Sequence, residues 1–410
     1  MTYDYLLLGG GTSCAYAAVK IRERDKNGTV AIIGAESEPP YDRPPFSKYY
    51  LWNDEKNVDD FHSKDESFYP QNNVELILGC RASAIDTTAK VVKCEDGREI
   101  GYGKLLYALG SEPRHLAVPG GELAWVLRTA ENSKRIRDAA TKGSHAILVG
   151  GGYIGAELAA SLAGRGCDVT VIERGDMAWS QFPSKAAAKA ITAELKNKGV
   201  KLVTGENVAS IENGKAVKTK EGNSYSGDFV VVGVGASPRI ELARSAGIKT
   251  GKSGVLADLH LLTSAKDVWA CGDVVEYQDA VLGEPYRVEH HLHAKGSAEF
   301  CGNAMAGENA EYRGLPWFFS DVGDLSMNLR GYPERAARSI AINDTEEPVV
   351  TEVFLFADDT VAGVVDVRKD YKVQDPIMEK FGELITARAK STEVPKALEE
   401  LGIDGSMAKL

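Results

Sequence analysis

The sequence predicts an α/β fold with two Rossmann-like domains and a C-terminal α+β domain. A hydrophobic run breaks into glycines at residues 9–11, and the same pattern recurs at residues 150–152. Each time a helix-like stretch and a second β-branched run follow, which is a strand–turn–helix–strand unit. After about Pro316 the pattern changes to one typical of antiparallel strands and helices. With 410 residues, the chain is long enough for two or three domains.

In chain order, the first unit is expected to contain a strand at Tyr5–Leu8, a helix at Ala15–Arg24 and a strand at Val30–Ile33. The apolar run from Leu105 to Gly110 predicts a further strand that ends in a glycine turn. The second unit repeats the order, with a strand at residues 146–149, a helix at 156–165 and a strand at 169–172.

Two more apolar runs, Phe229–Gly235 and Val268–Asp273, predict strands that end in glycine turns. In the C-terminal part, residues 349–356 and 361–367 are expected to form antiparallel strands around a turn at 357–360. Helices are expected at 375–388 and 395–401. These elements predict a dinucleotide-binding domain at 1–118 and 245–315, a second at 119–244, and an α+β domain at 316–410.

Both glycine clusters resemble the dinucleotide-binding fingerprint, Gly-x-Gly-x-x-Gly. The second cluster, Gly150, Gly152 and Gly155, fits in full, whereas the first has Gly9, Gly11 and a cysteine, Cys14, at the third position. The glycines permit a tight turn and the close approach of a pyrophosphate, which binds at the helix N-terminus. Two such motifs, each between a strand and a helix, indicate two bound dinucleotides.

An acidic residue follows each second strand. Glu173 ends the second strand of the second unit, where a carboxylate binds the ribose hydroxyls and repels a 2′-phosphate. It therefore predicts a preference for NADH over NADPH, which the adjacent Arg174 would weaken. Glu36 is the candidate in the first unit. An ordinary exposed carboxylate at a strand end is the alternative for either residue.

Composition and charge exclude several classes of function. The net charge is −11 and no long lysine or arginine run occurs, so nucleic-acid binding is not expected. No apolar run approaches the ~20 residues of a membrane-spanning helix, and the N-terminus reads as a strand and not as a secretory signal. We therefore expect a cytoplasmic protein without a membrane span. The C-terminal Ala408-Lys409-Leu410 differs by one residue from a peroxisomal signal, which leaves a peroxisomal location as the alternative.

The cysteines and histidines do not indicate a redox or metal centre. None of the six cysteines lies within four residues of another, so they are interpreted as small buried thiols. His290, His291 and His293 cluster, but no acid or cysteine lies at a supporting ligand spacing. No metal site is predicted.

The segment Pro40-Tyr-Asp-Arg-Pro-Pro-Phe-Ser-Lys48 resembles the Arg-Pro-Pro-Leu-Ser-Lys loop of the ferredoxin-reductase-like flavoproteins, FAD-dependent pyridine nucleotide oxidoreductases. The segments 287–293 and 317–321 resemble apoptosis-inducing factor within that superfamily. The resemblance covers nearly the whole chain. Two departures are Ala35, where the family has an acid, and Phe319, where it has tryptophan. The long C-terminal insertion of mammalian apoptosis-inducing factor is absent, so an apoptotic role is not supported.

The resemblance implies that FAD binds the discontinuous first domain and NADH the inserted second domain. Combined with the motifs, it implies FAD-side residues at Gly9, Gly11, Thr12, Ser13, Glu36, Arg43, Lys48, Ala82, Arg128, Gly272, Asp273, Glu289, His290 and Phe319. The implied NAD-side residues are Gly150, Gly152, Tyr153, Ile154, Gly155, Glu173, Gly235 and Glu289.

The resemblance also implies catalytic roles for Lys48, Glu157 and His290. The matching lysine of the family approaches the flavin N5 edge and pairs with the matching glutamate, whereas Glu289 and His290 match the flavin–nicotinamide interface. A solvated lysine and a helix N-terminal glutamate are the alternative reading of Lys48 and Glu157.

The expected function is transfer of a hydride from NADH to FAD, and then of electrons to an unidentified acceptor. A small redox protein, a quinone, monodehydroascorbate and oxygen all remain open as acceptors, as do a monomer and a homodimer. A disulfide reductase would need a redox cysteine near Ser47, and that loop has none. The second alternative is a slowly turning NADH-sensing flavoprotein that regulates a protein partner.

Overall fold

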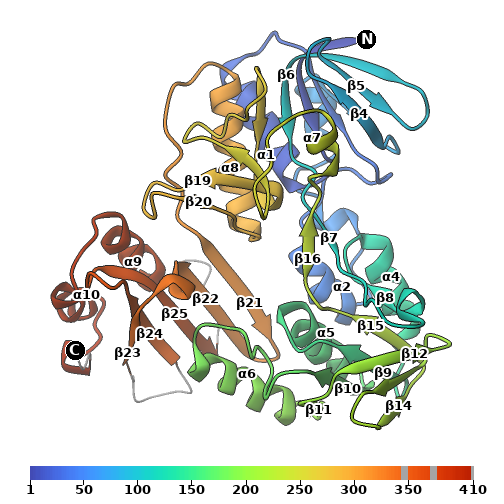
Figure 1. Cartoon of the computed structure of the whole chain (residues 1–410), viewed down its shortest axis with the longest axis vertical. Coiled ribbons are helices and arrows are strands. Elements are labelled where there is room, and N and C mark those ends of the chain that lie inside the picture. Colours follow the sequence, from blue (N-terminus) through green and yellow to red (C-terminus); the bar gives the residue numbers. More distant parts are fainter. Residues whose placement is uncertain (343–349, 370–375, 408–410) are drawn as a thin grey trace. The chain divides into compact units, whose positions relative to one another are not determined.

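The structure is a computed structural model that describes residues 1–342, 350–369 and 376–407 (Figure 1). The chain folds into two compact units, each assembled from three segments. The first unit comprises Met1–Arg43, Asn57–Glu112 and Ala236–Gly314. The second comprises Pro44–Lys56, Pro113–Gly235 and Leu315–Leu410. The chain leaves the first unit at β7 (Ser111–Pro113) and re-enters it at β16 (Ala236–Pro238).

The first unit is built on a seven-stranded sheet with β1 (Thr2–Leu8) inside it. The strand order is β3-β2-β1-β6-β5-β4, and β18 also pairs with β6. The strands around β1 are parallel and buried on both faces, which explains their continuous apolar runs. The remaining strands are β2 (Val30–Ile33), β3 (Val74–Ile77), β4 (Ala82–Asp86), β5 (Val91–Cys94), β6 (Glu99–Tyr107) and β18 (Val268–Ala270).

Two helices of the first unit, α1 (Thr12–Arg24) and α8 (His291–Met305), pack side by side (Figure 1). Small residues make this close packing possible: Gly302 of α8 lies against the backbone of Ala17 in α1. A second sheet has the order β17-β19-β20. The other elements of this unit are α3 (Phe68–Gln71), α7 (Glu241–Ser245), β17 (Val255–Ala257), β19 (Val275–Gln278), β20 (Pro285–Tyr286) and the 3₁₀ turns η2 (Asp59–Phe61) and η4 (Gly272–Val274).

The second unit contains a parallel five-stranded sheet in the order β11-β10-β9-β15-β8. Its strands are β8 (Trp125–Val126), β9 (His145–Val149), β10 (Asp168–Glu173), β11 (Lys201–Thr204) and β15 (Phe229–Val232). An antiparallel ribbon of β12 (Val208–Glu212), β13 (Ala216–Thr219) and β14 (Ser224–Ser226) accompanies it. The helices are α2 (Tyr49–Trp52), α4 (Ala130–Ala139), α5 (Tyr153–Gly164) and α6 (Lys185–Asn197).

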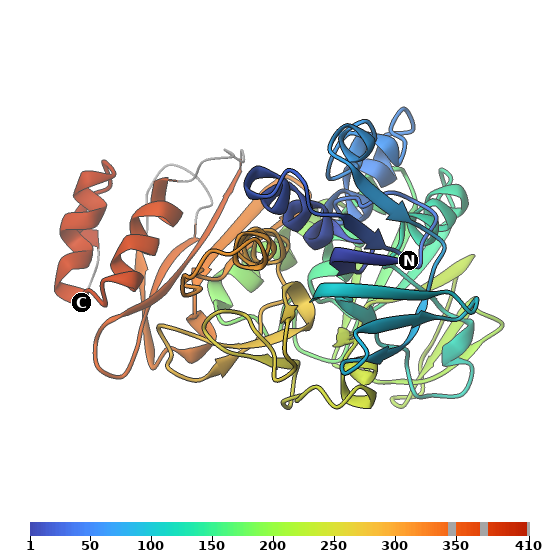
Figure 2. The same ribbon diagram turned by 90° about the horizontal axis from the view of Figure 1, so that it is seen from above.

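The C-terminal part of the second unit is an antiparallel sheet in the order β21-β22-β25-β24-β23. Its strands are β21 (Trp317–Val322), β22 (Leu325–Gly331), β23 (Arg338–Ile342), β24 (Val350–Leu355) and β25 (Val361–Lys369). Helix α9 (Pro376–Thr386) packs on β22 and β25, and α10 (Val394–Glu400) follows it (Figure 2). Helix α6 packs against four strands of the same sheet, so this sheet shares one hydrophobic core with the parallel sheet.

The expected fold class is confirmed, and the differences lie at the ends of helices and strands. The strand expected from Leu105 begins at Glu99 as β6, and the strand expected from Tyr5 begins at Thr2 as β1. Helix α1 begins at Thr12 and α5 at Tyr153, each three residues before the expected start, because the second glycine of each motif, Gly11 or Gly152, is itself the N-cap. Of the expected boundaries, Val349, Asp375 and the tripeptide 408–410 lie outside the described residues. Within the described residues, no helix is both long and apolar enough to cross a membrane.

Candidate functional site

The first glycine cluster joins β1 to α1 and leaves an open helix N-terminus. Gly9 has φ +139°, and a Cβ there would lie 2.3 Å from the carbonyl oxygen of Ala108, so only glycine fits. At Gly11, the N-cap, a Cβ would meet nothing within 4 Å. Among the described residues, no side chain caps the helix. Free N–H groups beside open space are what a phosphate requires.

The second cluster repeats this arrangement between β9 and α5. Gly150 has φ +101°, and a Cβ at Gly155 would lie 1.9 Å from the carbonyl oxygen of Gly150. Gly152 is the N-cap, without a side-chain cap and with open space at its Cβ position. The next two side chains, Tyr153 and Ile154, are large, apolar and 40% and 42% exposed. We call each glycine cluster with the open helix N-terminus that follows it a cradle. Exposed apolar side chains beside a cradle are suited to contact a bound nucleotide.

Glu173 ends β10 beside the second cluster, as the sequence predicted for the acid. Its side chain is buried, and its carboxylate accepts the Gly151 N–H at 2.6 Å and the Gly175 N–H at 2.7 Å. A carboxylate offers about four acceptor positions, so acceptor capacity remains for ribose hydroxyls. The two backbone bonds fix the orientation of the carboxylate next to the cradle.

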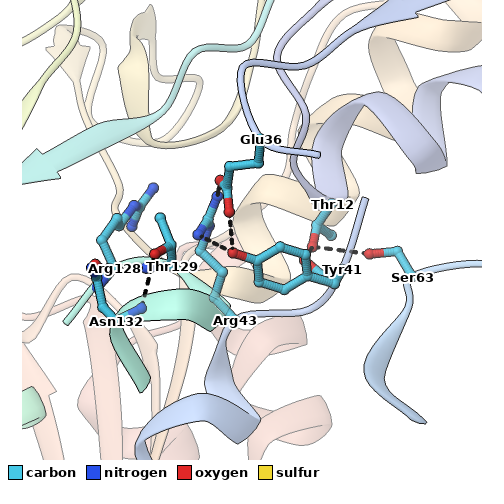
Figure 3. Close-up of polar contacts among 8 residues, drawn as sticks. All are labelled: Thr12, Glu36, Tyr41, Arg43, Ser63, Arg128, Thr129 and Asn132. Carbon is cyan, nitrogen blue, oxygen red and sulfur yellow. Dashed lines mark hydrogen bonds and ion pairs between the residues drawn. The ribbon is translucent and has the colours of Figure 1, made fainter. Parts of the chain in front are cut away.

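In the first unit, Glu36 is held by two side chains of the loop that follows it (Figure 3). Its carboxylate accepts the Tyr41 hydroxyl at 2.5 Å and pairs with Arg43 at 2.8 Å, and Arg43 also donates to the Tyr41 oxygen at 2.9 Å. The ion pair is about one quarter exposed. Glu36 and Arg43, predicted separately for the FAD side, thus contact each other.

Thr12 connects the start of α1 to the same loop (Figure 3). Its hydroxyl lies 2.9 Å from Asp42 Oδ1 and 3.2 Å from the Ser63 hydroxyl, and Ser63 donates to Asp42 at 2.6 Å. On the next residue, the Ser13 hydroxyl donates to the carbonyl oxygen of Ala294 in α8 at 3.1 Å. These bonds fix the loop and α8 against the helix N-terminus.

The Gly272–Asp273 turn forms η4 directly after β18. Gly272 has φ +72°, and its N–H donates to Ser297 of α8 at 3.1 Å. The Asp273 carboxylate accepts the Ser111 hydroxyl at 3.1 Å. Arg287 donates to the Asp273 backbone oxygen at 3.2 Å and pairs with Glu289 at 2.7 Å. The turn and Glu289, both predicted for the cofactor site, therefore share one arginine.

His290 is the N-cap of α8, and His293 lies in its first turn. Burial, and then the neighbouring His293, lowers the pKa of His290 to about 3. Burial lowers the pKa of His293 to about 4. The His293 ring stacks on Tyr277 at 5.3 Å and lies within hydrogen-bond distance of the Tyr312 hydroxyl. Both imidazoles are neutral at pH 7.

Lys48 and Glu157, paired in the sequence prediction, contact each other inside the second unit. Their side chains are 7% and 6% exposed, and Nζ lies 3.1 Å from Oε1. The Ser47 hydroxyl donates to the other carboxylate oxygen of Glu157. Helix α5 supplies Glu157, and the segment before α2 supplies the other two residues. The lysine is therefore not a solvated surface residue.

Two residues of β21 complete this buried cluster. Both lie in the segment 317–321 that carried part of the resemblance, but neither was predicted as a site residue. Ser320 donates to Glu157 at 2.6 Å, and Asp321 lies 3.4 Å from Lys48 Nζ. Burial lowers the pKa of the Lys48 ammonium, but the carboxylates of Glu157 and Asp321 raise it more, so this pKa lies above its usual range. Nζ also lies 5.1 Å from the ring centre of Phe319. The cluster holds a charged ammonium group in place.

The remaining predicted positions lie at turns or strand ends. Arg128 precedes Thr129, which forms a capping box with Asn132 at the start of α4, and the Arg128 N–H donates to Asn132 Oδ1 at 3.2 Å (Figure 3). Ala82 begins β4 in the first unit. Gly235, with φ +103°, accepts the Arg114 N–H at 2.9 Å.

All six cysteines are free and buried, as predicted. The fold nevertheless brings Cys80 and Cys94 together beside Asp96, with ligand atoms within 4.8 Å of one another. Sequence spacing could not reveal this pair, because the β4–β5 hairpin places its two members together.

The family described as pyridine nucleotide-disulphide oxidoreductase matches residues 3–305. The chain is 31% identical over 361 residues to a rubredoxin-NAD(+) reductase of Pseudomonas putida. The aligned region covers 86% of this chain and 92% of that protein. The chain is also 31% identical over 332 residues to the ferredoxin–NAD(+) reductase component of a 3-phenylpropionate/cinnamic acid dioxygenase of Photorhabdus laumondii, covering 80% and 84%.

Solved structures agree with this likeness. A ferredoxin reductase from Rhodopseudomonas palustris has a TM-score of 0.83 at 29% identity and covers 89% of this chain and 91% of that one. The reductase in a covalent putidaredoxin reductase–putidaredoxin complex has a TM-score of 0.88 at 24% identity, covers 98% and 99%, and shares the fold.

Proposed function

The chain belongs to the pyridine nucleotide-disulphide oxidoreductase family, and we propose that its electron acceptor is a small redox protein of the ferredoxin or rubredoxin class. The chain is an FAD-dependent NAD(P)H oxidoreductase that passes a hydride from NADH to FAD. The acceptor is inferred from relatives named as rubredoxin and ferredoxin reductases, which are covered over most of their length.

FAD is assigned to the first unit and NADH to the second. The observation that supports two dinucleotide sites is the pair of open, uncapped helix N-termini at Gly11 and Gly152. Each has the space and the free N–H groups that a pyrophosphate needs. The family resemblance then gives FAD to the first unit and NADH to the second. In this proposal, Glu36 and Asp273 bind the ribose and ribityl hydroxyls of FAD in the first unit, and Glu173 binds the ribose hydroxyls of NADH in the second.

The bound flavin supplies the electron chemistry, accepting two electrons and passing them on. The residues of this chain bind, orient and provide charge. In this proposal, Lys48 presents a fixed positive charge to the flavin as negative charge develops there, which lowers the cost of reduction. Glu157 and Asp321 keep the ammonium charged despite its burial. The neutral His290 at the start of α8 adds no positive charge of its own.

Stopped-flow kinetics test the proposal. The enzyme is reduced with one equivalent of NADH and then mixed with a ferredoxin, a rubredoxin, a neutral quinone, monodehydroascorbate or oxygen. We expect reoxidation by at least one of the two proteins to exceed that by the other acceptors by tenfold or more at equal concentration. Faster reoxidation by a quinone or monodehydroascorbate would replace the proposed acceptor class. Slow reoxidation by all five would favour the NADH-sensing alternative.

A further inference from the structure

In the first unit, outside the glycine cradles, a buried histidine faces three carboxylates. His62 directly follows η2, and its side chain is 4% exposed. Its Nε2 lies 3.9 Å from Glu38 Oε2 and 3.8 Å from Asp59 Oδ1. On the other side of the ring, Nδ1 lies 3.8 Å from Glu66 Oε1. Residues from two separate segments thus surround one imidazole.

Within the described residues, the hydrogen-bonding capacity of His62 Nε2 and the charge of the three carboxylates are not balanced by other groups of the protein. His62 Nε2 is buried and has no hydrogen-bond partner within the described part of the chain. The distances to both carboxylates are too long for hydrogen bonds. Leaving a buried polar nitrogen without a partner costs about 1–3 kcal/mol. Within residues 1–342, 350–369 and 376–407, none of the three carboxylates forms an ion pair with a lysine or arginine. The cluster therefore has an excess of negative charge and an open nitrogen.

The spacing of the ligand atoms fits a metal ion after a small contraction. Nε2 and the Glu38 and Asp59 oxygens all lie within 4.8 Å of one another. Ligands about 2.0–2.2 Å from a zinc ion lie roughly 3.3 Å apart in tetrahedral geometry. The two Nε2–carboxylate distances of 3.9 and 3.8 Å must shorten by about half an ångström, and the two carboxylate oxygens must approach each other by up to about 1.5 Å. The Glu38 and Asp59 side chains are 40% and 79% exposed, so they have room to move. Glu66 at Nδ1 is placed like the carboxylate that usually orients a metal-bound histidine.

Backbone contacts hold the two ligand segments together without a metal. The Asp42 N–H donates to the Phe61 oxygen, and the Ser63 N–H donates to the Pro40 oxygen, both at 2.9 Å. Glu38 is followed by two prolines, which restrict its backbone to extended conformations. Ser63, the residue after His62, contacts Thr12 (Figure 3). The ligands are thus partly preorganised beside the first cradle.

We propose that Glu38, Asp59 and His62 bind a first-row divalent metal ion such as Zn²⁺ or Mn²⁺, with Glu66 hydrogen-bonded to the free ring nitrogen. Water completes the coordination on the exposed side. The ion links the segment that contains Glu36 and Tyr41 to the segment that contains Ser63. In consequence, and resting on the assignment of FAD to this unit, metal binding slows FAD release.

Mn²⁺ titration monitored by electron paramagnetic resonance tests the site on FAD-loaded protein cleared of metals by a chelator. Bound Mn²⁺ loses the six-line signal of the free ion. Mn²⁺ is the first probe because carboxylates and imidazole bind it better than thiolates do, which separates this cluster from the one at Cys80 and Cys94. We expect one equivalent to bind the wild type, and Zn²⁺ to displace it.

The variants define the ligands. His62→Gln and Asp59→Asn should each weaken Mn²⁺ binding at least tenfold, and Glu66→Gln about tenfold because it acts through the ring. Glu55→Gln, at an exposed acid outside the cluster, and Cys80→Ser should leave binding unchanged. Equal binding by wild type and His62→Gln would overturn the site, as would loss of binding in Cys80→Ser alone.

FAD release provides a second measurement that does not depend on turnover. Fluorescence of released FAD is followed after dilution, with Mn²⁺ or with chelator. We expect Mn²⁺ to slow release at least threefold in the wild type and to have no effect in His62→Gln. If Mn²⁺ binds through His62 but release does not change, the metal site stands and its link to FAD is wrong. That result leaves the oxidoreductase assignment untouched.

Discussion

Glu173 is a buried carboxylate already fixed by two backbone N–H groups, so its charge has a defined position beside the second cradle. We expect the wild type to prefer NADH over NADPH by about 1–3 kcal/mol, roughly 5- to 150-fold in kcat/KM. Glu173→Gln should narrow the ratio of the two kcat/KM values, because the charge that repels a 2′-phosphate is gone. Asp176→Asn, which removes an exposed acid nearby, should not change it. Equal kcat/KM for both cofactors in the wild type would contradict the role.

Lys48 and Glu157 form a buried ion pair, so each depends on the other. Lys48→Met should slow reduction by NADH and make the flavin midpoint potential more negative with FAD still bound, because a positive charge is lost. Glu157→Gln should shift the same quantities. The double variant should be non-additive, since the residues touch. Lys134→Met, at an exposed lysine, serves as the control. Wild-type rates and potentials in both single variants would show that the pair does not tune the flavin.

His293 is buried as a neutral imidazole, which makes stability depend on pH. In the unfolded chain it takes up a proton near its ordinary pKa of about 6.5, whereas in the folded chain that pKa is about 4. The unfolded state therefore binds more protons between these values. The contribution of the neutral His293 side chain to the free energy of unfolding is complete above about pH 6.5 and is lost as the pH falls toward 4.

Urea unfolding at saturating FAD measures this contribution at pH 7.5 and pH 5. The wild type should lose about 2 kcal/mol more than His293→Gln over that interval. The pKa of His290, lowered to about 3 mainly by burial, acts in the same direction in both proteins and lies well below pH 5, so its contribution changes little in the comparison. The same pH dependence in the variant and the wild type would disprove the assignment.

At the scale of the elements, Gly11 and Gly152 are equivalent positions in the two strand–glycine–helix motifs. A Cβ would meet nothing within 4 Å at Gly11 or at Gly152, and neither residue has a positive φ. Alanine at either position should therefore preserve the fold, and fill only the space that a pyrophosphate approaches. Gly11→Ala should purify with little FAD, whereas Gly152→Ala should keep FAD and raise the Kd for NAD⁺.

Flavin absorbance measures the FAD content of both purified variants, and nucleotide titration measures their Kd for NAD⁺. The circular dichroism of both should match the wild type. Loss of FAD from Gly152→Ala with retention in Gly11→Ala would reverse the assignment of the two cofactors to the units.

The sequence predicted best the elements whose own residues show the pattern that identifies them. Val30–Ile33 is apolar on every residue because β2 is buried on both faces, and its bounds matched. The helix starts at Thr12 and Tyr153 were placed three residues late, because a glycine N-cap carries no side-chain signal.

Contacts between distant segments were predictable only where a family pattern supplied them. Lys48 and Glu157 were paired through the resemblance, whereas Ser320 and Asp321 join them only because β21 packs on α5. No spacing rule links Glu38 to His62, or Cys80 to Cys94, because loop and hairpin geometry brings these residues together.

At the scale of the whole molecule, the net charge of −11 bears on the proposed protein acceptor. Two acidic proteins repel each other at long range, and added salt screens this repulsion. With an acidic ferredoxin, the second-order rate of electron transfer should therefore rise as ionic strength increases from about 10 to about 200 mM. A basic redox protein should show the opposite trend, and a neutral quinone none, which controls for effects of salt on the flavin itself. The measurement is stopped-flow reoxidation of the prereduced enzyme at several salt concentrations. A rate with the acidic ferredoxin that falls with salt would mean that a local basic surface, and not the net charge, steers the encounter.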